Sequence, residues 1–190
     1  MLDTALKEWS IICDLLLTGR QTILLRKGGI HESAGPGRFE LEFDRFLLFP
    51  SWLHQTPQGV KEEFRGQVTH FGHEPPEITF QGLGEVGGIW PVPSRAAFGQ
   101  LDDLHGWSSA QVDMRFSYKP QNPLYLVAVR TYRLVQPHTI SNSSAYGGCR
   151  SWVPLIPGDA VDDAGAGPVL DDAVFAAVVR RISDAMTGPG

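Results

Sequence analysis

The sequence predicts an α+β fold in which a mostly antiparallel, strongly curved sheet or barrel is flanked by an N-terminal and a C-terminal helix. Segments with strand character cluster in the middle of the chain, between residues 21 and 156. Near each end, apolar residues recur at spacings of three and four, which is typical of an amphipathic helix. A parallel, doubly wound sheet would contradict this prediction.

The first predicted helix begins at Asp3 or Thr4, since either side chain can cap it. Its apolar stripe consists of Leu6, Trp9, Cys13 and Leu16. Gly19 lies where a helix commonly ends in a left-handed residue. The segment QTILLR, residues 21–26, is then a predicted strand that the glycines of KGGI end.

The middle of the chain contains the remaining strands. They are expected at 38–43, 45–50, 67–71, 77–81, 124–135 and 151–156. A short helix is expected at 60–64 and a longer one over 95–105. The glycine-rich segment 82–93 lacks the glycine spacing and the Lys-Ser or Lys-Thr pair of a phosphate-binding loop.

The last element is an amphipathic helix begun by Pro168. Its inward positions are expected to be Leu170, Val174, Val178 and Ile182. The preceding segment, 157–167, is rich in Asp, Gly and Ala and is predicted to be a mobile linker. We expect one PUA-like globular domain over 1–157, with the acidic linker and helix of 158–190 packed on it.

Charge and composition exclude several classes of protein. The net charge is −5, but six of the 21 acidic residues and only two of the 16 basic ones follow residue 157, so the body is nearly neutral. Extended binding along duplex nucleic acid needs many phosphate contacts and is disfavoured. There is no membrane span or signal peptide, and two cysteines are too few for a disulfide framework. These features predict a cytoplasmic protein.

The N-terminal element resembles that of ASCH-type members of the PUA-like superfamily, in which a helix leads through Gly-x-Lys-x-x-Glu-x-Arg into a curled β-barrel. The matching positions here are Gly19, Gln21, Leu24 and Arg26. The resemblance implies a PUA-like fold and a role for Arg26. In enzymatic ASCH relatives the Lys and Glu are implicated in amide hydrolysis, and Gln21 and Leu24 replace them here.

A second resemblance covers most of residues 5–155. The motifs ALKEW, LLRKGGI, FLLFPSWLHQ, VRTYRL and YGGCRSWVPL are similar to those of the bacterial domain of unknown function family numbered 1802. Members of that family occur with restriction-endonuclease-like domains, which implies a restriction or DNA-defence context.

The end of the first predicted strand is a candidate anion site. Arg26 and Lys27 supply positive charge, while Gly28 and Gly29 allow the backbone N–H groups to approach a phosphate or carboxylate. A tight turn with solvated charges is the alternative interpretation.

Two further segments combine aromatic and polar side chains. Trp52, His54 and Gln55 follow a buried strand and have the chemistry to stack on a base and bond to its edge. In the segment 144–152, the glycines permit close approach of a ligand. The candidates there are Tyr146, Arg150, Ser151 and Trp152. Buried aromatic rings are the alternative in both segments.

Catalytic and metal-binding residues are less clearly indicated. Cys149, beside Arg150, and His54 are the candidate catalytic residues. His70 and His73 are candidate metal ligands, with no third ligand at a fixed spacing. No acidic residue lies two positions before any of the four lysines, which excludes the Glu/Asp-x-Lys element of restriction-type nucleases.

We interpret the chain as a nucleic-acid-binding module that takes a single nucleotide of DNA, such as a flipped or modified base. Two alternatives remain open. One is a small metal- or cysteine-dependent hydrolase or nuclease, and the other is a scaffold that contacts protein partners through the acidic C-terminal region. No cofactor is predicted.

Overall fold

The computed structural model describes residues 1–27, 43–69, 73–148 and 150–188. Within these residues the strands are β1 (Thr4–Trp9), β2 (Ile23–Lys27), β3 (Arg45–Ser51), β4 (Glu77–Pro91), β5 (Leu124–Ser141), β6 (Trp152–Pro154) and β7 (Gly167–Pro168). The α-helices are α1 (Ser10–Leu17), α2 (Arg95–Gly99), α3 (Ser109–Ser117) and α4 (Asp172–Thr187). Short 3-10 helices are η1 (Pro57–Gly59), η2 (Glu62–Gln67), η3 (Asp102–Leu104) and η4 (Ser144–Tyr146).

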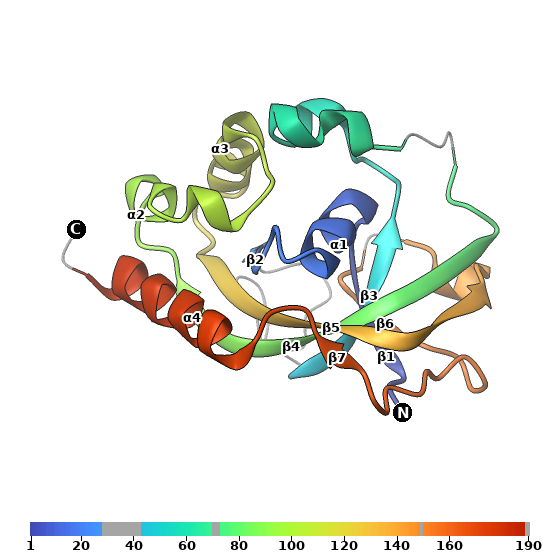
Figure 1. The fold of residues 1–190 in the computed structure, drawn as a ribbon. Coiled ribbons are helices and arrows are strands. Elements are labelled where there is room, and N and C mark those ends of the chain that lie inside the picture. Colours follow the sequence, from blue (N-terminus) through green and yellow to red (C-terminus); the bar gives the residue numbers. More distant parts are fainter. Residues whose placement is uncertain (28–42, 70–72, 149, 189–190) are drawn as a thin grey trace.

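The strands form one sheet in the order β2-β5-β4-β3-β1-β6, with β7 paired to β5. Only the β1–β3 pair is parallel among these pairings. The long strands β4 and β5 run side by side and bend together, and α1, α2 and α3 lie on the same side of them (Figure 1). The predicted α+β class with a strongly curved, mostly antiparallel sheet is therefore confirmed; the described strands form an open path rather than a closed barrel.

Curvature brings β2, at one end of the sheet, back toward β1, the strand next to the other end. Strands β1 and β2 are separated along the sheet by β3, β4 and β5. Even so, Arg26 Nη2 of β2 lies 2.9 Å from Glu8 Oε2 of β1. We call this meeting of β1 and β2 the seam of the sheet, because side chains rather than backbone hydrogen bonds join it.

Two hydrophobic cores lie on opposite faces of the sheet. Consecutive side chains of a strand point to opposite faces. On β3, Phe46 and Leu48 accordingly belong to the core that contains α1 and β2, while Leu47 and Phe49 belong to the other core. The strand is buried on both faces, which explains its continuous apolar sequence.

The N-terminal helix starts later than predicted. Residues 4–9 form β1, and the helix begins at Ser10. β1 pairs with β3 on one side and β6 on the other, so tertiary backbone pairing overrides the helical spacing of Leu6 and Trp9. Gly19 lies just past the helix with φ of 71°, as its position predicted.

The glycine-rich segment is part of β4 rather than a loop. Aromatic rings lie directly on its glycines: a Cβ at Gly84 would lie 2.8 Å from the ring of Phe46, and one at Gly87 would lie 2.7 Å from that of Phe175. The glycines therefore make room for the helices and strands that pack on this strand.

The helical segments of the middle differ in detail from those predicted. The helix expected over 95–105 is α2 followed by η3, and 60–64 falls in η2 and the residues before it. α3 was not predicted; Ser108 caps it by accepting a hydrogen bond from Gln111 N, but Val112 is its one buried residue. Residues 67–69 form no strand, and residues 38–42, 70 and 71 lie outside the described residues.

The C-terminal helix begins at Asp172 rather than at Pro168, which lies in β7, and its inward face is only partly the one expected. In α4, Ile182 is buried as predicted; Phe175 and Met186 are also buried, whereas Val174 is 45% exposed. The segment expected to be a mobile linker makes specific contacts: Val161 pairs with Leu2, and Asp163 Oδ2 lies 3.1 Å from Arg45 Nη2.

The Phe175 contact gives a stability prediction. Phe175→Ala removes a buried ring from its place on Gly87 and should lower the free energy of unfolding by about 3 kcal/mol, as buried Phe truncations do. Val174→Ala, at the neighbouring exposed position, is the control and should change it by less than about 0.5 kcal/mol. Urea denaturation measures both, and equal effects would contradict the assigned inward face.

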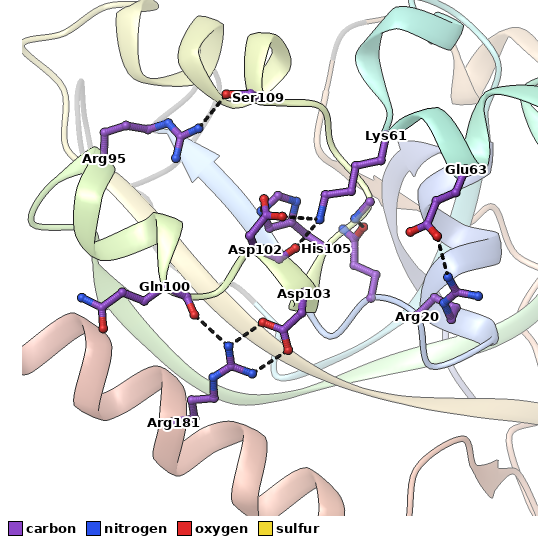
Figure 2. Close-up of polar contacts among 12 residues, drawn as sticks. Arg20, Lys61, Glu63, Arg95, Gln100, Asp102, Asp103, His105, Ser109 and Arg181 are labelled. Carbon is purple, nitrogen blue, oxygen red and sulfur yellow. Dashed lines mark hydrogen bonds and ion pairs between the residues drawn. The ribbon is translucent and has the colours of Figure 1, made fainter.

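His105 is a buried imidazole near the junction of η3 with the body (Figure 2). Its ring stacks on Phe98 with centroids 5.0 Å apart, and its Nε2 lies 3.7 Å from Asp102 Oδ1. Lys61 Nζ lies 2.9 Å from the other carboxylate oxygen of Asp102. Burial, together with the charge of Lys61, lowers the pKa of His105 from 6.5 to about 4.

This pKa predicts acid sensitivity. The unfolded chain binds the imidazole proton more tightly than the folded chain, so the contribution of His105 to stability is fully present above pH 6.5 and is lost as the pH falls toward 4. The loss should approach about 3 kcal/mol. Because other groups also titrate in this interval, the test is a comparison: unfolding free energies from pH 7 to pH 4 should fall less steeply in His105→Phe. Identical slopes would contradict the assignment.

Candidate functional site

A cleft of about 450 Å³ opens at the seam. Its charged lining consists of four basic residues, Lys7, Arg26, Arg115 and Arg150, and two acidic ones, Glu8 and Glu74. Trp9 contributes aromatic surface, and His54 and Asn142 contribute polar groups. An excess of positive charge in a concave site favours an anionic ligand.

The Glu8–Arg26 pair lies in this lining and is nearly dry. Glu8 is 6% exposed and Arg26 is 9% exposed. Glu8 Oε1 accepts a hydrogen bond of 2.9 Å from Trp9 N. Although Arg26 Nη2 and Glu8 Oε2 are 2.9 Å apart, they are not aligned as a hydrogen bond, and Arg26 Nε has no hydrogen-bond partner among the described residues. The guanidinium thus keeps donors for a ligand.

Arg115 brings a second guanidinium to the cleft from α3. Its Nε is also buried without a hydrogen-bond partner among the described residues. Burial lowers the pKa of Arg115; Glu8 opposes this effect and Arg26 adds to it, so the three charges interact with one another. Two guanidinium groups around one carboxylate leave a net positive charge.

Lys27 fixes α3 against β2. Its Nζ donates to the carbonyl oxygens of Arg115 and Phe116, each at 3.1 Å, and to that of Tyr118. A cation at a helix C-terminus satisfies carbonyls that lack partners within the helix. Lys27 therefore helps to place Arg115 beside Arg26. Its ammonium is bonded to the carbonyls at the end of α3, whereas the sequence suggested either a phosphate ligand or a solvated charge.

The turn after β3 lines one part of the cleft. Glu74 Oε2 accepts a hydrogen bond of 3.1 Å from Trp52 N, and Glu74 Oε1 accepts one of 2.5 Å from Ser51 Oγ. His54 has φ of 66°, a left-handed conformation that is uncommon outside glycine. The carboxylate of Glu74 thus holds the turn that carries His54 on the cleft wall.

Residues 146–148, 150 and 151 line another part of the cleft. Lys7 Nζ donates to Tyr146 O at 2.7 Å, and Arg150 Nη2 donates to Ala145 O at 2.8 Å. The Tyr146 ring is buried, its hydroxyl donates to Asp159 Oδ2 at 2.5 Å, and the same oxygen accepts from Ile156 N at 3.1 Å. Burial raises the pKa of Tyr146. Its ring has no free face on which a base could stack.

The structure brings only part of the predicted set together. Arg26, His54, Tyr146, Arg150 and Ser151 line the cleft. Besides Lys27, which binds the end of α3, three others lie elsewhere. Trp52 lines a separate cavity of about 260 Å³ with Cys13 and Asp14.

The other two are buried. Gln55 bonds to Ile11 N and Thr69 O. The Trp152 ring packs edge-on against Phe43 and Phe46. Gln55 and Trp152 therefore support the fold rather than the cleft.

Four candidates, Gly28, Gly29, His70 and Cys149, lie outside the described residues. His73 is described, and within the described ranges no group of three or more His, Cys, Asp or Glu side chains has the proximity for a metal ion. None of the described helices combines the length and the apolarity that crossing a bilayer requires.

Sequence reasoning missed Glu8, Arg115, Lys7 and Asn142. Glu8 and Lys7 were assigned to a helix, where strand pairing was not visible. Arg115 and Asn142 are far from Arg26 in the chain, and no local motif links them.

The acidic C-terminal region is largely engaged within the chain. Asp159 accepts from the Tyr146 hydroxyl, Asp163 pairs with Arg45, and Asp172 pairs with Arg130. Asp171 caps α4 by accepting from Val174 N. These contacts leave less free carboxylate for a protein partner than the sequence predicted.

The two residues that differ from the ASCH pattern, Gln21 and Leu24, support the fold here. Gln21 is buried, donates to Ile23 O at 2.9 Å and accepts from Gly106 N at 2.9 Å. Leu24 is in the core. Neither side chain lines the cleft.

Comparisons with known proteins show the family of this chain and the solved structures that resemble it. No curated protein is detectably similar to it. Solved structures that resemble it include ASCH from Zymomonas mobilis, with 12% identity and a TM-score of 0.49 over 82% of this chain and 89% of that one. A serine-to-alanine variant of the same ZmASCH protein has 12% identity and a TM-score of 0.49 over 84% and 94%. These are of the class that the N-terminal element resembles. The model of the family described as a domain of unknown function, DUF1802, matches residues 5–181, and the chain belongs to that family.

Proposed function

We propose that this protein is a nucleic-acid-binding module that takes a single nucleotide into the seam cleft, with its phosphate on Arg26 and Arg115. The observation that carries the proposal is the pair of buried guanidinium Nε–H groups without hydrogen-bond partners among the described residues. A buried donor left unsatisfied costs about 1–3 kcal/mol. A phosphate oxygen accepting from these donors would offset that cost, and Arg forks match phosphate geometry.

The size of the cleft supports one nucleotide at a time. Its volume of about 450 Å³ is within the range of small-ligand sites and far too small for a duplex. A base must therefore leave its stack to enter, from a single strand or by flipping, which costs a few kcal/mol and least at mismatched or damaged positions. The nearly neutral body agrees with such local contact, since it provides little attraction along a duplex.

We further propose that the nucleic acid is DNA and that a modified or flipped base is the preferred occupant, in a restriction or defence setting. Glu8, Asn142 and His54 supply acceptors and donors in the same cleft with which a base edge can bond. Glu8 Oε2 accepts no hydrogen bond among the described residues, so it can accept one from a base amino or imino group.

Two substitutions test the phosphate contact and leave the buried carboxylate of Glu8 with a positive partner. Deleting Arg26 outright would leave Glu8 buried and unpaired, which is strongly destabilising. Arg26→Lys keeps the charge but loses the fork, and Arg115→Gln loses the charge. Each should weaken oligonucleotide binding about 10- to 150-fold, the value of a charged hydrogen bond. Arg115→Gln should also reduce the salt dependence by about one phosphate contact.

The measurement is fluorescence titration with short single strands and with duplexes carrying mismatched or modified bases, because Trp9 lies in the cleft. Arg20→Ala, which removes an exposed arginine paired with Glu63, is the matched control and should bind normally. If no oligonucleotide binds more tightly than about 100 μM at low salt, the proposed function is wrong.

Tyr146→Phe separates stability from binding. The change removes a hydroxyl that joins Asp159 and Ile156, so the free energy of unfolding should fall by about 1–3 kcal/mol. Oligonucleotide affinity should change less than about twofold, since the buried ring makes no stacking contact. A large loss of affinity in a folded Tyr146→Phe protein would show that the hydroxyl reaches the ligand.

A further inference from the structure

A patch of exposed apolar surface lies at the C-terminal end of α3, close to Arg115 in the chain. Tyr118 is 54% exposed and Met114 is 47% exposed. Tyr118 directly follows the last residue of α3, and its N donates to Met114 O at 2.9 Å, so Tyr118 lies at the end of the helix next to the turn that carries Met114 and Arg115. We call Met114 and Tyr118 the α3 platform. It lies beside the cleft rather than in it, because neither residue is part of the cleft lining.

Charge around the α3 platform favours a polyanion. Lys119 Nζ lies 5.3 Å from the centroid of the Tyr118 ring. The nearby acid, Asp113, is neutralised by Arg95, with Nε to Oδ1 at 2.7 Å. Single-strand-binding proteins combine exposed aromatic rings, on which bases stack, with nearby positive charge that follows the backbone.

The platform is held in a fixed relation to the cleft. Lys27 Nζ donates to the carbonyl oxygens of Arg115 and Tyr118, and Lys27 directly follows Arg26 in β2. One strand thus positions the phosphate-binding guanidinium and the helix end that carries the ring. Lys119 has φ of 43°, an uncommon conformation outside glycine that its surroundings maintain beside the ring.

We infer that the α3 platform is a second base-binding subsite, on which the nucleotide next to the one in the cleft stacks, so that the ligand is a single-stranded segment of at least two nucleotides. The inference rests on the proposed function, because the cleft must hold the first nucleotide. A base already stacked in a duplex has no free face to offer, so the strand is unpaired at this position.

The experiment compares deoxyadenosine monophosphate with a phosphorylated deoxyadenosine dinucleotide and a short oligodeoxyadenosine, titrated into the full chain. The dinucleotide should bind more tightly than the mononucleotide. Tyr118→Ala should weaken the dinucleotide and the oligonucleotide about 5- to 150-fold and change the mononucleotide less than about twofold. Tyr118→Phe keeps the ring and should bind normally. Val135→Ala, which trims an exposed apolar residue on β5, is the surface control and should also bind normally.

The outcomes separate the two proposals. A dinucleotide that binds no better than the mononucleotide overturns the platform and leaves the cleft intact. Equal losses for all three ligands in Tyr118→Ala also overturn it, since the ring would then act through the cleft. If none of the ligands binds, the proposed function fails first. Lys27 contacts the Tyr118 carbonyl, which every substitution retains; should Tyr118→Ala nevertheless unfold, Tyr118→Leu keeps the bulk without the aromatic face, and normal dinucleotide binding by it would overturn the inference.

Discussion

The arrangement of the protein depends on the ion pair between Glu8 and Arg26. These residues belong to strands that three others separate along the sheet, and they meet only because the sheet curls back on itself. Both charged side chains are almost inaccessible to solvent. The free-energy cost of removing two charges from water is offset only while the two charges remain close to each other. Any relaxation of the curvature would separate them and leave each charge buried alone. The seam therefore couples the curvature of the sheet to the existence of the cleft.

One short strand end serves two purposes because side chains alternate along it. Arg26 points into the cleft and Lys27 points away from it, toward the carbonyl end of α3. The ammonium of Lys27 satisfies helix carbonyls and so helps to fix a segment whose own apolar contacts with the core come from Val112 and Phe116. Arg115 then reaches the cleft from a helix that would otherwise be weakly held. This explains how two guanidinium groups, which repel each other, are kept around one carboxylate.

Local chemistry allowed part of the fold to be predicted. Gly19 ends a helix for the expected reason, and the apolar runs of β3 and β5 are strands as expected. The errors arise where partners are distant in sequence. β1 has helical spacing but is fixed by pairing with β3 and β6, and the glycines of β4 accommodate rings from Phe46 and Phe175. α3 has a capping serine but too little apolar periodicity to be recognised.

The candidate site was less predictable than the fold, and the reason is chemical. Aromatic side chains fill cores as readily as they stack on bases, so Tyr146 and Trp152 could not be assigned from residue type; both prove to be buried. Arginines are different, because a buried guanidinium must use its donors or pay for their desolvation. Whether those donors are satisfied depends on Glu8, Arg26 and Arg115 together, and these come from three separate parts of the chain. A single unpartnered donor does not mark a site, since Trp152 Nε1 and Arg130 Nε are also buried without partners among the described residues and lie outside the cleft. The grouping of Arg26 and Arg115 around Glu8 in one cleft is the more specific sign, and only the folded arrangement reveals it.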